Sequence, residues 1–323
     1  DGGHPGTWEE RQTRERPAAE ILVREQRAEG TEKPGGACRG LVLAAGRGSR
    51  LPSDAGQPFP KVLRPVLGRP MVCWVLDTLS RAGVGDVTVV VGFGADQVRL
   101  ALGDTVRYVL QEEQLGSGHA VACAAPRFRG FDGSLLVMCG DSPLFTARTV
   151  SNMIRTHTRS GAVATLAAAV LDDPTGYGRI VRDAEGKVAG VSEEKCASQV
   201  ERSLREVNGG AYVFHARWLF DNIQNMALNE ADEYNLTDII RVAVEQGRDV
   251  ATVTCEPEEL LGVNSPKQLA AVEQILRRRS GRSMQMNTRK AKLKDGRYII
   301  YYTFSGGNER QRESDRSRRK GRQ

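Results

Sequence analysis

The sequence predicts an α/β protein with a Rossmann-like, mixed but mainly parallel sheet flanked by helices. Short apolar, β-branched runs recur from residue 41 onward, and amphipathic helical patterns separate them. Such alternation is typical of parallel sheets, whose crossover helices cover the strands. The chain has 323 residues, of which 40% are hydrophobic and 27% charged, so its composition is that of an ordinary globular protein.

Five runs have the composition of strands buried on both faces, because they are apolar nearly throughout. They are LVLAA (41–45), VTVVVG (87–92), VRYVLQ (106–111), SLLVMCGD (134–141) and AVATLAAAV (162–170). Helices are expected between them, where apolar residues lie three and four apart and glycine follows. These segments are MVCWVLDTLSRAG (71–83), ADQVRLALG (95–103) and TVSNMIRTHTRSG (149–161).

The second half changes character. Residues 177–194 contain two alternating segments around DAEG, which indicates a hairpin, and 206–216 adds another strand. Two amphipathic helices, 235–247 and 265–276, are expected to follow, the first with Asn235 as its N-cap.

Composition divides the chain into three parts. Residues 1–38 lack a sustained apolar period and are interpreted as a mobile N-terminal arm, 39–280 as one domain, and 281–323 as a basic, disordered tail. From residue 277 onward sixteen Lys or Arg stand against four Asp or Glu, which leaves 30 basic and 36 acidic residues in the rest. The net charge of +6 therefore says little about what the folded part binds.

Several function classes are disfavoured by what the sequence contains. No segment has the pattern of a signal peptide or membrane span, so we expect a cytoplasmic protein that does not engage membranes. The six cysteines are scattered without a CxxC pair, so neither zinc nor disulfides are expected. The basic tail offers phosphate contacts to a nucleic acid, but such runs are more often simply solvated.

The stretch LAAGRGSRL (43–51) places a glycine-rich loop directly after the first strand. It lacks the third small residue of a dinucleotide-binding GxGxxG turn, and the chain has no GxxxxGK[ST] motif. Backbone N–H groups near Gly46 and Gly48, together with Arg47, Arg50 and Lys61, can cradle a polyphosphate. A strand-ending turn with solvated arginines fits this stretch equally well.

The same stretch, followed by PKVL (60–63), resembles the nucleotide-binding signature of sugar-nucleotide pyrophosphorylases. Further segments narrow the resemblance to the uridylyltransferase domain of bacterial N-acetylglucosamine-1-phosphate uridylyltransferases, in which they occur in the same order. They are LQEEQLGSGHA (110–120), CGDSPL (139–144), DDPTGYGRI (172–180), VSEEK (191–195), EVNGGAY (206–212), DEYNLTDII (232–240) and GVNSP (262–266). The resemblance covers roughly residues 40–280 and implies the nucleotide-diphospho-sugar transferase type of fold.

In that family a sugar phosphate oxygen attacks the α-phosphorus of UTP and pyrophosphate departs. The resemblance therefore implies synthesis of UDP-N-acetylglucosamine from UTP and N-acetylglucosamine 1-phosphate, with Mg²⁺, for peptidoglycan of the cell wall. Both partners are small molecules, and the oligomeric state stays open. Alternatives are a related transferase for another sugar or nucleotide, or a non-catalytic nucleotide-sugar or RNA-binding protein.

The resemblance also assigns roles around the phosphates. Arg50 and Lys61 match catalytic positions, whereas Arg47 matches a less central one. Asp141, at the carboxyl end of a strand, and Asn264 match the two metal ligands, and hard divalent cations prefer such oxygens. Without the resemblance, Asp141 reads as a helix-capping carboxylate and Asn264 as a turn residue.

The remaining predicted contacts are to the base and the sugar. Gln111 is expected to read uracil, since a primary amide pairs with its N3–H and carbonyl edge. The predicted nucleotide contacts are Leu43, Ala44, Ala45, Gly46, Gln111, Gly116, Ser117, Cys139, Gly140 and Asn264. The predicted sugar contacts are Gly178, Glu193 and Asn208. Structural alternatives exist for each of these groups. Residues 112–120 can be a loop that enters a helix with Ser117 as its cap, Gly178 a hairpin glycine, Glu193 a solvated acid and Asn208 a turn residue.

Two departures from the family pattern stand out. The segment AGQPF (55–59) is longer than in many relatives, which could displace Lys61. No hexapeptide periodicity follows residue 280, so the acetyltransferase activity and trimerisation of a left-handed β-helix domain are not carried over.

Overall fold

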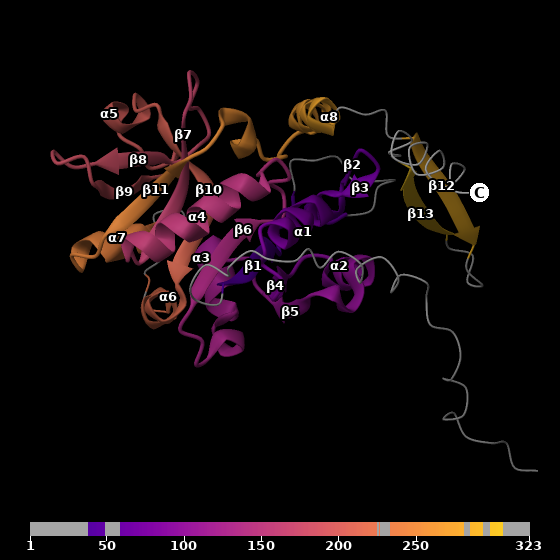
Figure 1. Cartoon of the computed structure of the whole chain (residues 1–323), viewed down its shortest axis with the longest axis horizontal. Helices are drawn as coiled ribbons and strands as arrows, with labels where there is room; N and C mark the ends of the chain where they lie inside the picture. The colour runs from indigo at the N-terminus through magenta and orange to yellow at the C-terminus, as the bar shows by residue number, and fades with distance from the viewer. Residues whose placement is uncertain are drawn as a thin grey trace, which may run out of the picture. The chain divides into compact units, whose positions relative to one another are not determined.

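The computed structural model describes residues 38–48, 59–224, 226 and 233–280, and the backbone of 285–292 and 298–305. Its centre is a nine-stranded sheet with the strand order β11-β7-β10-β6-β1-β4-β5, to which β8 and β9 are attached (Figure 1). The strands are β1 (Cys38–Ala44), β4 (Val87–Val91), β5 (Arg107–Leu110), β6 (Ser134–Cys139), β7 (Ala164–Val170), β8 (Arg179–Arg182), β9 (Val188–Ser192), β10 (Glu206–His215) and β11 (Val250–Thr254).

The sheet is mixed but mainly parallel, as predicted. β1 pairs in parallel with β4 and β6, β4 with β5, and β7 with β11, whereas β10 runs antiparallel between β6 and β7. Parallel strands end at the same edge, so the loops after β1, β4, β5 and β6 gather there.

Helices cover both faces of this sheet (Figure 1). One face carries α1 (Met71–Arg81), α2 (Ala95–Leu102) and α4 (Ala147–Ser160), and the other carries α3 (Ser117–Cys123), α6 (Ala216–Ile223) and α7 (Asp238–Glu245). The short helix α5 (Gln199–Arg202) buries no residue, and α8 (Pro266–Ser280) packs in a separate cluster with Val66, Met71 and Leu144. Within β1, Val42 packs in the cluster with α1, α2 and α4, whereas Leu41 packs in the cluster with α3, α6 and α7. This alternation explains why the strand is apolar nearly throughout.

The helix ends follow ordinary capping chemistry. Thr146 caps α4 by accepting the N–H of Thr149 at 3.1 Å, and Gly161 ends that helix in the left-handed region with φ of 67°. The N-cap predicted at Asn235 lies two residues later, at Thr237, so α7 begins at Asp238, and the N–H of Asp238 donates to Asn235 O in the turn before it.

Several short elements were not predicted. α3 has only seven residues, and α6 follows β10 without a break, so its start merged with the apolar strand predicted at 206–216. β11 is a five-residue strand at the edge of the sheet. A short 3-10 helix, η3 (Lys61–Leu63), precedes a two-residue ladder of β2 (Pro65–Val66) and β3 (Arg69–Pro70).

The expectation of a disordered tail is wrong over two stretches. β12 (Gln285–Lys292) and β13 (Tyr298–Ser305) pair as an antiparallel ladder. The reason is that YIIYYTF supplies β-branched and aromatic residues, whose strand propensity offsets the basic composition around it. Residues 1–37 of the expected N-terminal arm lie outside the described residues, whereas Cys38, also assigned to the arm, is the first residue of β1. No helix of the described part of the chain is long and apolar enough to cross a membrane.

Candidate active site

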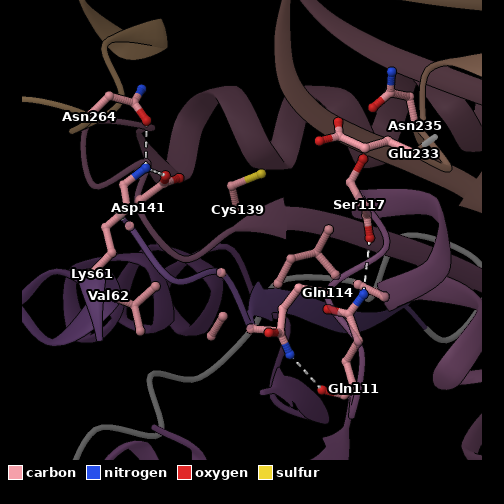
Figure 2. A pocket seen from close by; sticks show the side chains of 17 residues that line it. Lys61, Val62, Gln111, Gln114, Ser117, Cys139, Asp141, Glu233, Asn235 and Asn264 are labelled. Atoms are coloured by element: carbon pink, nitrogen blue, oxygen red, sulfur yellow. Dashed lines mark hydrogen bonds and ion pairs between the residues drawn. The ribbon is translucent and has the colours of Figure 1, made fainter. Parts of the chain in front are cut away.

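A cavity of about 430 Å³ opens where β1 and β6 end, a common size for small-molecule sites (Figure 2). Its walls come from the loop after β1, from η3, from the β5–α3 loop and from the segments preceding α7 and α8. The lining residues are Leu43, Ala44, Ala45, Gly46, Gly48, Lys61, Val62, Gln111, Gln114, Gly116, Ser117, Ala120, Cys139, Asp141, Glu233, Asn235 and Asn264.

Three predicted residues meet at one end of this cavity. The Lys61 ammonium forms an ion pair with the Asp141 carboxylate and donates to Asn264 Oδ1 at 2.7 Å (Figure 2). Asp141 follows Lys61 by 80 positions in the sequence and Asn264 follows it by 203. The Lys61 and Asp141 side chains are only 12% and 23% exposed, so this is a sheltered charge pair. The AGQPF segment has therefore not displaced Lys61 from the site.

The donor set suits a divalent metal. A carboxylate and an amide oxygen from separate loops converge on one cation, the Lys61 ammonium, which shows that the pair can hold positive charge between them. Mg²⁺ usually takes one or two protein oxygens and completes its shell with phosphate and water. Among the described residues no cluster of three or more His, Cys, Asp or Glu offers a closed metal cage.

The glycine loop lies directly against Lys61. Gly48 has φ of 64°, and a Cβ placed there would lie 2.5 Å from Lys61 Cβ. A Cβ on Gly46, by contrast, would meet nothing within 4 Å. Of these two loop glycines, Gly48 thus requires glycine on both backbone and steric grounds, whereas Gly46 faces open space.

Gly140 and Arg47 support the loop from outside the cavity lining. The Gly140 N–H donates to Leu43 O at 2.9 Å and so joins the ends of β6 and β1. Arg47 Nε donates to Gln114 Oε1 at 3.3 Å, and it is exposed. Arg50, the other predicted catalytic cation, lies outside the described residues.

Gln111, Gly116 and Ser117 form the opposite end of the cavity. Gln111 is 3% exposed, and its Nε2 donates to Gly116 O at 3.1 Å. Its amide is held further by His119 Nδ1, also at 3.1 Å. The Ser117 hydroxyl oxygen accepts the N–H of Leu236 at 2.9 Å instead of capping α3, whose N-cap is Gly116.

The segment preceding α7 packs on this loop. Tyr234 accepts the N–H of Gly118 at 2.7 Å and donates its own N–H to Leu115 O at 2.9 Å. A Cβ on Gly116, whose φ is 107°, would lie 2.5 Å from Tyr234 O. The close approach places Glu233 and Asn235 in the cavity wall.

The predicted sugar contacts form a second group. Gly178 O accepts the N–H of Asn208 at 2.8 Å, and a Cβ on Gly178 would lie 3.4 Å from Glu193 Oε2. Glu193 Oε1 accepts the hydroxyl of Thr237 at 2.7 Å, while Asn208 Nδ2 donates to the Tyr212 hydroxyl at 2.7 Å. None of the three lines the cavity described above.

The pKa of the Cys139 thiol, at the end of β6, is influenced by charged residues of both groups. Burial raises the pKa of its thiol to about 12; the Asp141 carboxylate raises this pKa further, Lys61 lowers it, and Glu193 raises it by the smallest amount. The thiol is therefore neutral at ordinary pH and is unsuited to act as a nucleophile.

Gly48 lines the cavity as the predicted cradle requires, whereas five lining residues had not been predicted: Val62, Gln114, Ala120, Glu233 and Asn235. Gln114 and Glu233 lie inside the quoted motifs LQEEQLGSGHA and DEYNLTDII, so the motifs carried the signal. The Gln114 side chain is held by hydrogen bonds to Gln111 O and Glu112 O, and Glu233 reaches the cavity wall through the packing of Tyr234 against the loop. The sequence displays neither contact.

Comparisons with known proteins agree with this geometry. The family model of the MobA-like NTP transferase domain matches residues 40–285. The chain is 44% identical over 241 residues to the bifunctional protein GlmU of Pelotomaculum thermopropionicum, covering 74% of this chain and 52% of that protein. It is also 44% identical over 249 residues to the same-named protein of a Geobacillus species, covering 76% and 53%. The chain thus spans about half the length of the curated relatives it matches.

A solved structure shows the same fold. It is that of a putative glucose-1-phosphate thymidylyltransferase from Bacillus anthracis in complex with sucrose. The TM-score is 0.62 at 19% identity, and the match covers 75% of this chain and 96% of that one. Because the family model spans the cavity and nearly the whole described sheet, the chain belongs to the MobA-like NTP transferase domain family.

Proposed function

We propose that this chain is a nucleotidyltransferase that forms UDP-N-acetylglucosamine and pyrophosphate from UTP and N-acetylglucosamine 1-phosphate. The observation that carries the proposal is the convergence of Lys61, Asp141 and Asn264 at one end of a cavity whose other end is walled by Gln111. One cavity would thus hold both the groups that neutralise phosphate charge and the amide that reads the base. The similarity to GlmU proteins favours this sugar and nucleotide over other pairs.

The reaction needs positioning and electrostatic stabilisation more than a covalent nucleophile. The attacking oxygen belongs to the sugar phosphate, the bond that forms joins it to the α-phosphorus of UTP, and the bond that breaks releases pyrophosphate. We assign Lys61 to the phosphates nearest the attack, and Arg50 to the β and γ phosphates. The loop of Gly46 and Gly48 offers backbone N–H groups beside Lys61.

Asp141 and Asn264 would hold Mg²⁺ in this proposal. When bound there, the ion neutralises phosphate charge and orients the reacting groups. The Lys61 ammonium would bind a phosphate oxygen, since Lys61 lines the same cavity. Gly48 packs on the Lys61 side chain and lines this cavity as well.

At the nucleotide end, we assign the uracil edge to Gln111. Its Nε2 contacts with Gly116 O and His119 fix the amide plane before the nucleotide arrives. Gly178, Glu193 and Asn208 would hold the sugar, since a carboxylate and an amide suit its hydroxyl and acetamido groups.

The proposed catalytic domain comprises residues 39–280, with separate segments before and after it. The product would supply peptidoglycan precursors for the cell wall. We place the reaction in the cytoplasm because its proposed substrate, UTP, is a soluble metabolite.

A substrate panel tests the proposal. Pyrophosphate release is measured with UTP, CTP and dTTP against N-acetylglucosamine 1-phosphate, glucose 1-phosphate and galactose 1-phosphate, with and without Mg²⁺. The proposal predicts the highest kcat/KM for UTP with N-acetylglucosamine 1-phosphate. A higher value for another pair would replace the assigned substrates, and release with none would refute nucleotidyl transfer.

A further inference from the structure

An ion pair between a buried arginine and a partly exposed glutamate stands directly beside two of the proposed sugar contacts. Arg179 follows Gly178 in sequence and Glu194 follows Glu193, and Arg179 Nη2 lies 2.8 Å from Glu194 Oε2. The Arg179 side chain is 2% exposed, which makes it one of the largest fully buried side chains of the described chain.

The pair sits at the open end of the β8–β9 hairpin. Arg179 pairs in register with Ser192, and continuation of that antiparallel register places Gly178 opposite Glu193. The short distance from a Cβ on Gly178 to Glu193 Oε2, 3.4 Å, agrees with this placement. The ion pair therefore spans the same two chain segments as the proposed sugar contacts.

Both partners also hold backbone on the sugar side. Glu194 Oε2 accepts the N–H of Gly176 at 3.1 Å, and the Arg179 guanidinium donates to Tyr177 O. The hydrogen bond from Gly176 and the contact with Arg179 lower the pKa of Glu194, so the carboxylate is charged at neutral pH. The loop that ends at Gly178 is thus fixed at Gly176 and Tyr177.

Stability alone does not account for this arrangement. Arg179 Nε is buried without a hydrogen-bond partner in the described structure, which is an energetic cost. An apolar side chain of similar volume would fill this space without that cost, and replacing buried ion pairs in this way is often neutral or stabilising. What an apolar pair cannot do is hold the two segments at one fixed separation through directed bonds.

We propose that Arg179 and Glu194 are positioning residues that set the separation of Gly178 and Glu193, and so determine the affinity for the sugar 1-phosphate. The inference rests on the proposed function. Neither residue touches the reacting atoms. Their effect is expected at the sugar end, because the proposed nucleotide contacts lie on other segments: β1 and the loop after it, η3, the β5–α3 loop, the end of β6 and the segment before α8.

Two substitutions of Glu194 test this assignment, with KM measured for each substrate separately. Glu194→Ala removes the acceptor for Gly176 and is expected to raise the KM for the sugar 1-phosphate about ten- to hundredfold, with the KM for UTP within about twofold. Glu194→Gln keeps an amide oxygen that accepts from Gly176 and Arg179, so it is expected to restore most of the sugar affinity.

Glu206→Ala is the matched control. Glu206 pairs with Arg182 of the same hairpin at 2.5 Å and has similar exposure, 27% against 33% for Glu194, but adjoins neither Gly178 nor Glu193. Its KM values are expected to stay near those of the unsubstituted protein, and thermal unfolding checks that all variants fold.

Parallel changes in both KM values, or the same sugar-specific change in Glu206→Ala, would overturn the positioning role while leaving nucleotidyl transfer intact. Absence of transfer by the unsubstituted protein to any sugar 1-phosphate would overturn the proposed function and this inference together.

Discussion

Lys61 Nζ lies 2.7 Å from Asn264 Oδ1, although 203 positions separate the two residues. Lys61 is the first residue of η3, whereas Asn264 lies two residues before the start of α8, after the last strand of the central sheet. The same ammonium binds Asp141 after β6. Three segments that lie far apart in the sequence thus contribute one polar side chain each to this cluster.

Asp141→Asn is expected to lower kcat by at least about a hundredfold, because the carboxylate supplies the negative charge that a divalent cation requires. The amide keeps the shape of the side chain, so the fold should be retained. Pyrophosphate release is followed as Mg²⁺ is raised. Asp86→Asn, which affects only a surface pair with Arg39 and Arg107, is the control, and full activity of Asp141→Asn at low Mg²⁺ would remove Asp141 from the metal site.

Gly48→Ala and Gly46→Ala form a matched pair within one loop. The Gly48 substitution forces a Cβ to within 2.5 Å of Lys61 Cβ at a positive φ, whereas the Gly46 substitution meets nothing within 4 Å. We expect Gly48→Ala to lower kcat/KM by about tenfold or more through displacement of Lys61, and Gly46→Ala to have a smaller effect. Equal effects in steady-state assays would show that the contact with Lys61 does not matter.

Gln111→Ala is expected to narrow the preference for UTP over CTP, because the side chain that distinguishes the two pyrimidine edges is lost. The measurement is the ratio of the two kcat/KM values. Gln97→Ala on the exposed face of α2 should leave that ratio unchanged. If Gln111→Ala keeps the full UTP preference, the base is read elsewhere.

Because burial lowers the pKa of His157, the folded protein is expected to lose stability in acid. Burial, with a smaller contribution from His215, lowers its pKa to about 4, and the neutral ring pairs with the Thr165 hydroxyl at 3.1 Å. A histidine has a pKa near 6.5 when unfolded, so its stabilising contribution is complete above that value and is lost as pH falls toward 4. The shift corresponds to about 2 kcal/mol of unfolding free energy between pH 7 and pH 5.

Urea unfolding at the two pH values measures this contribution. The variant His157→Gln, which does not titrate, should lose less stability than the unsubstituted protein over the same interval. An identical pH dependence in the two proteins would assign the acid sensitivity to other groups.

Much of the fold could be predicted, because continuous apolar runs such as 87–92 and 162–170 are diagnostic of doubly covered strands. Asp141 could be placed at a strand end for the same reason. Its convergence with Asn264 on Lys61 could not, since this depends on how the segment before α8 packs on Asp141, whose carbonyl accepts the N–H of Val263 at 3.2 Å. Glu233 and Asn235 were missed as cavity residues because the packing of Tyr234 on Gly116 and Gly118, which turns them toward the cavity, leaves no period in the sequence.

The position of a bound nucleotide tests the central claim most directly. A crystal structure of the chain soaked with UTP and Mg²⁺ is predicted to show the triphosphate between the loop of Gly46 and Gly48 and the Lys61 side chain. The metal should touch Asp141 and Asn264, and uracil should lie against Gln111. A triphosphate bound elsewhere, with Lys61 still paired to Asp141, would contradict the account.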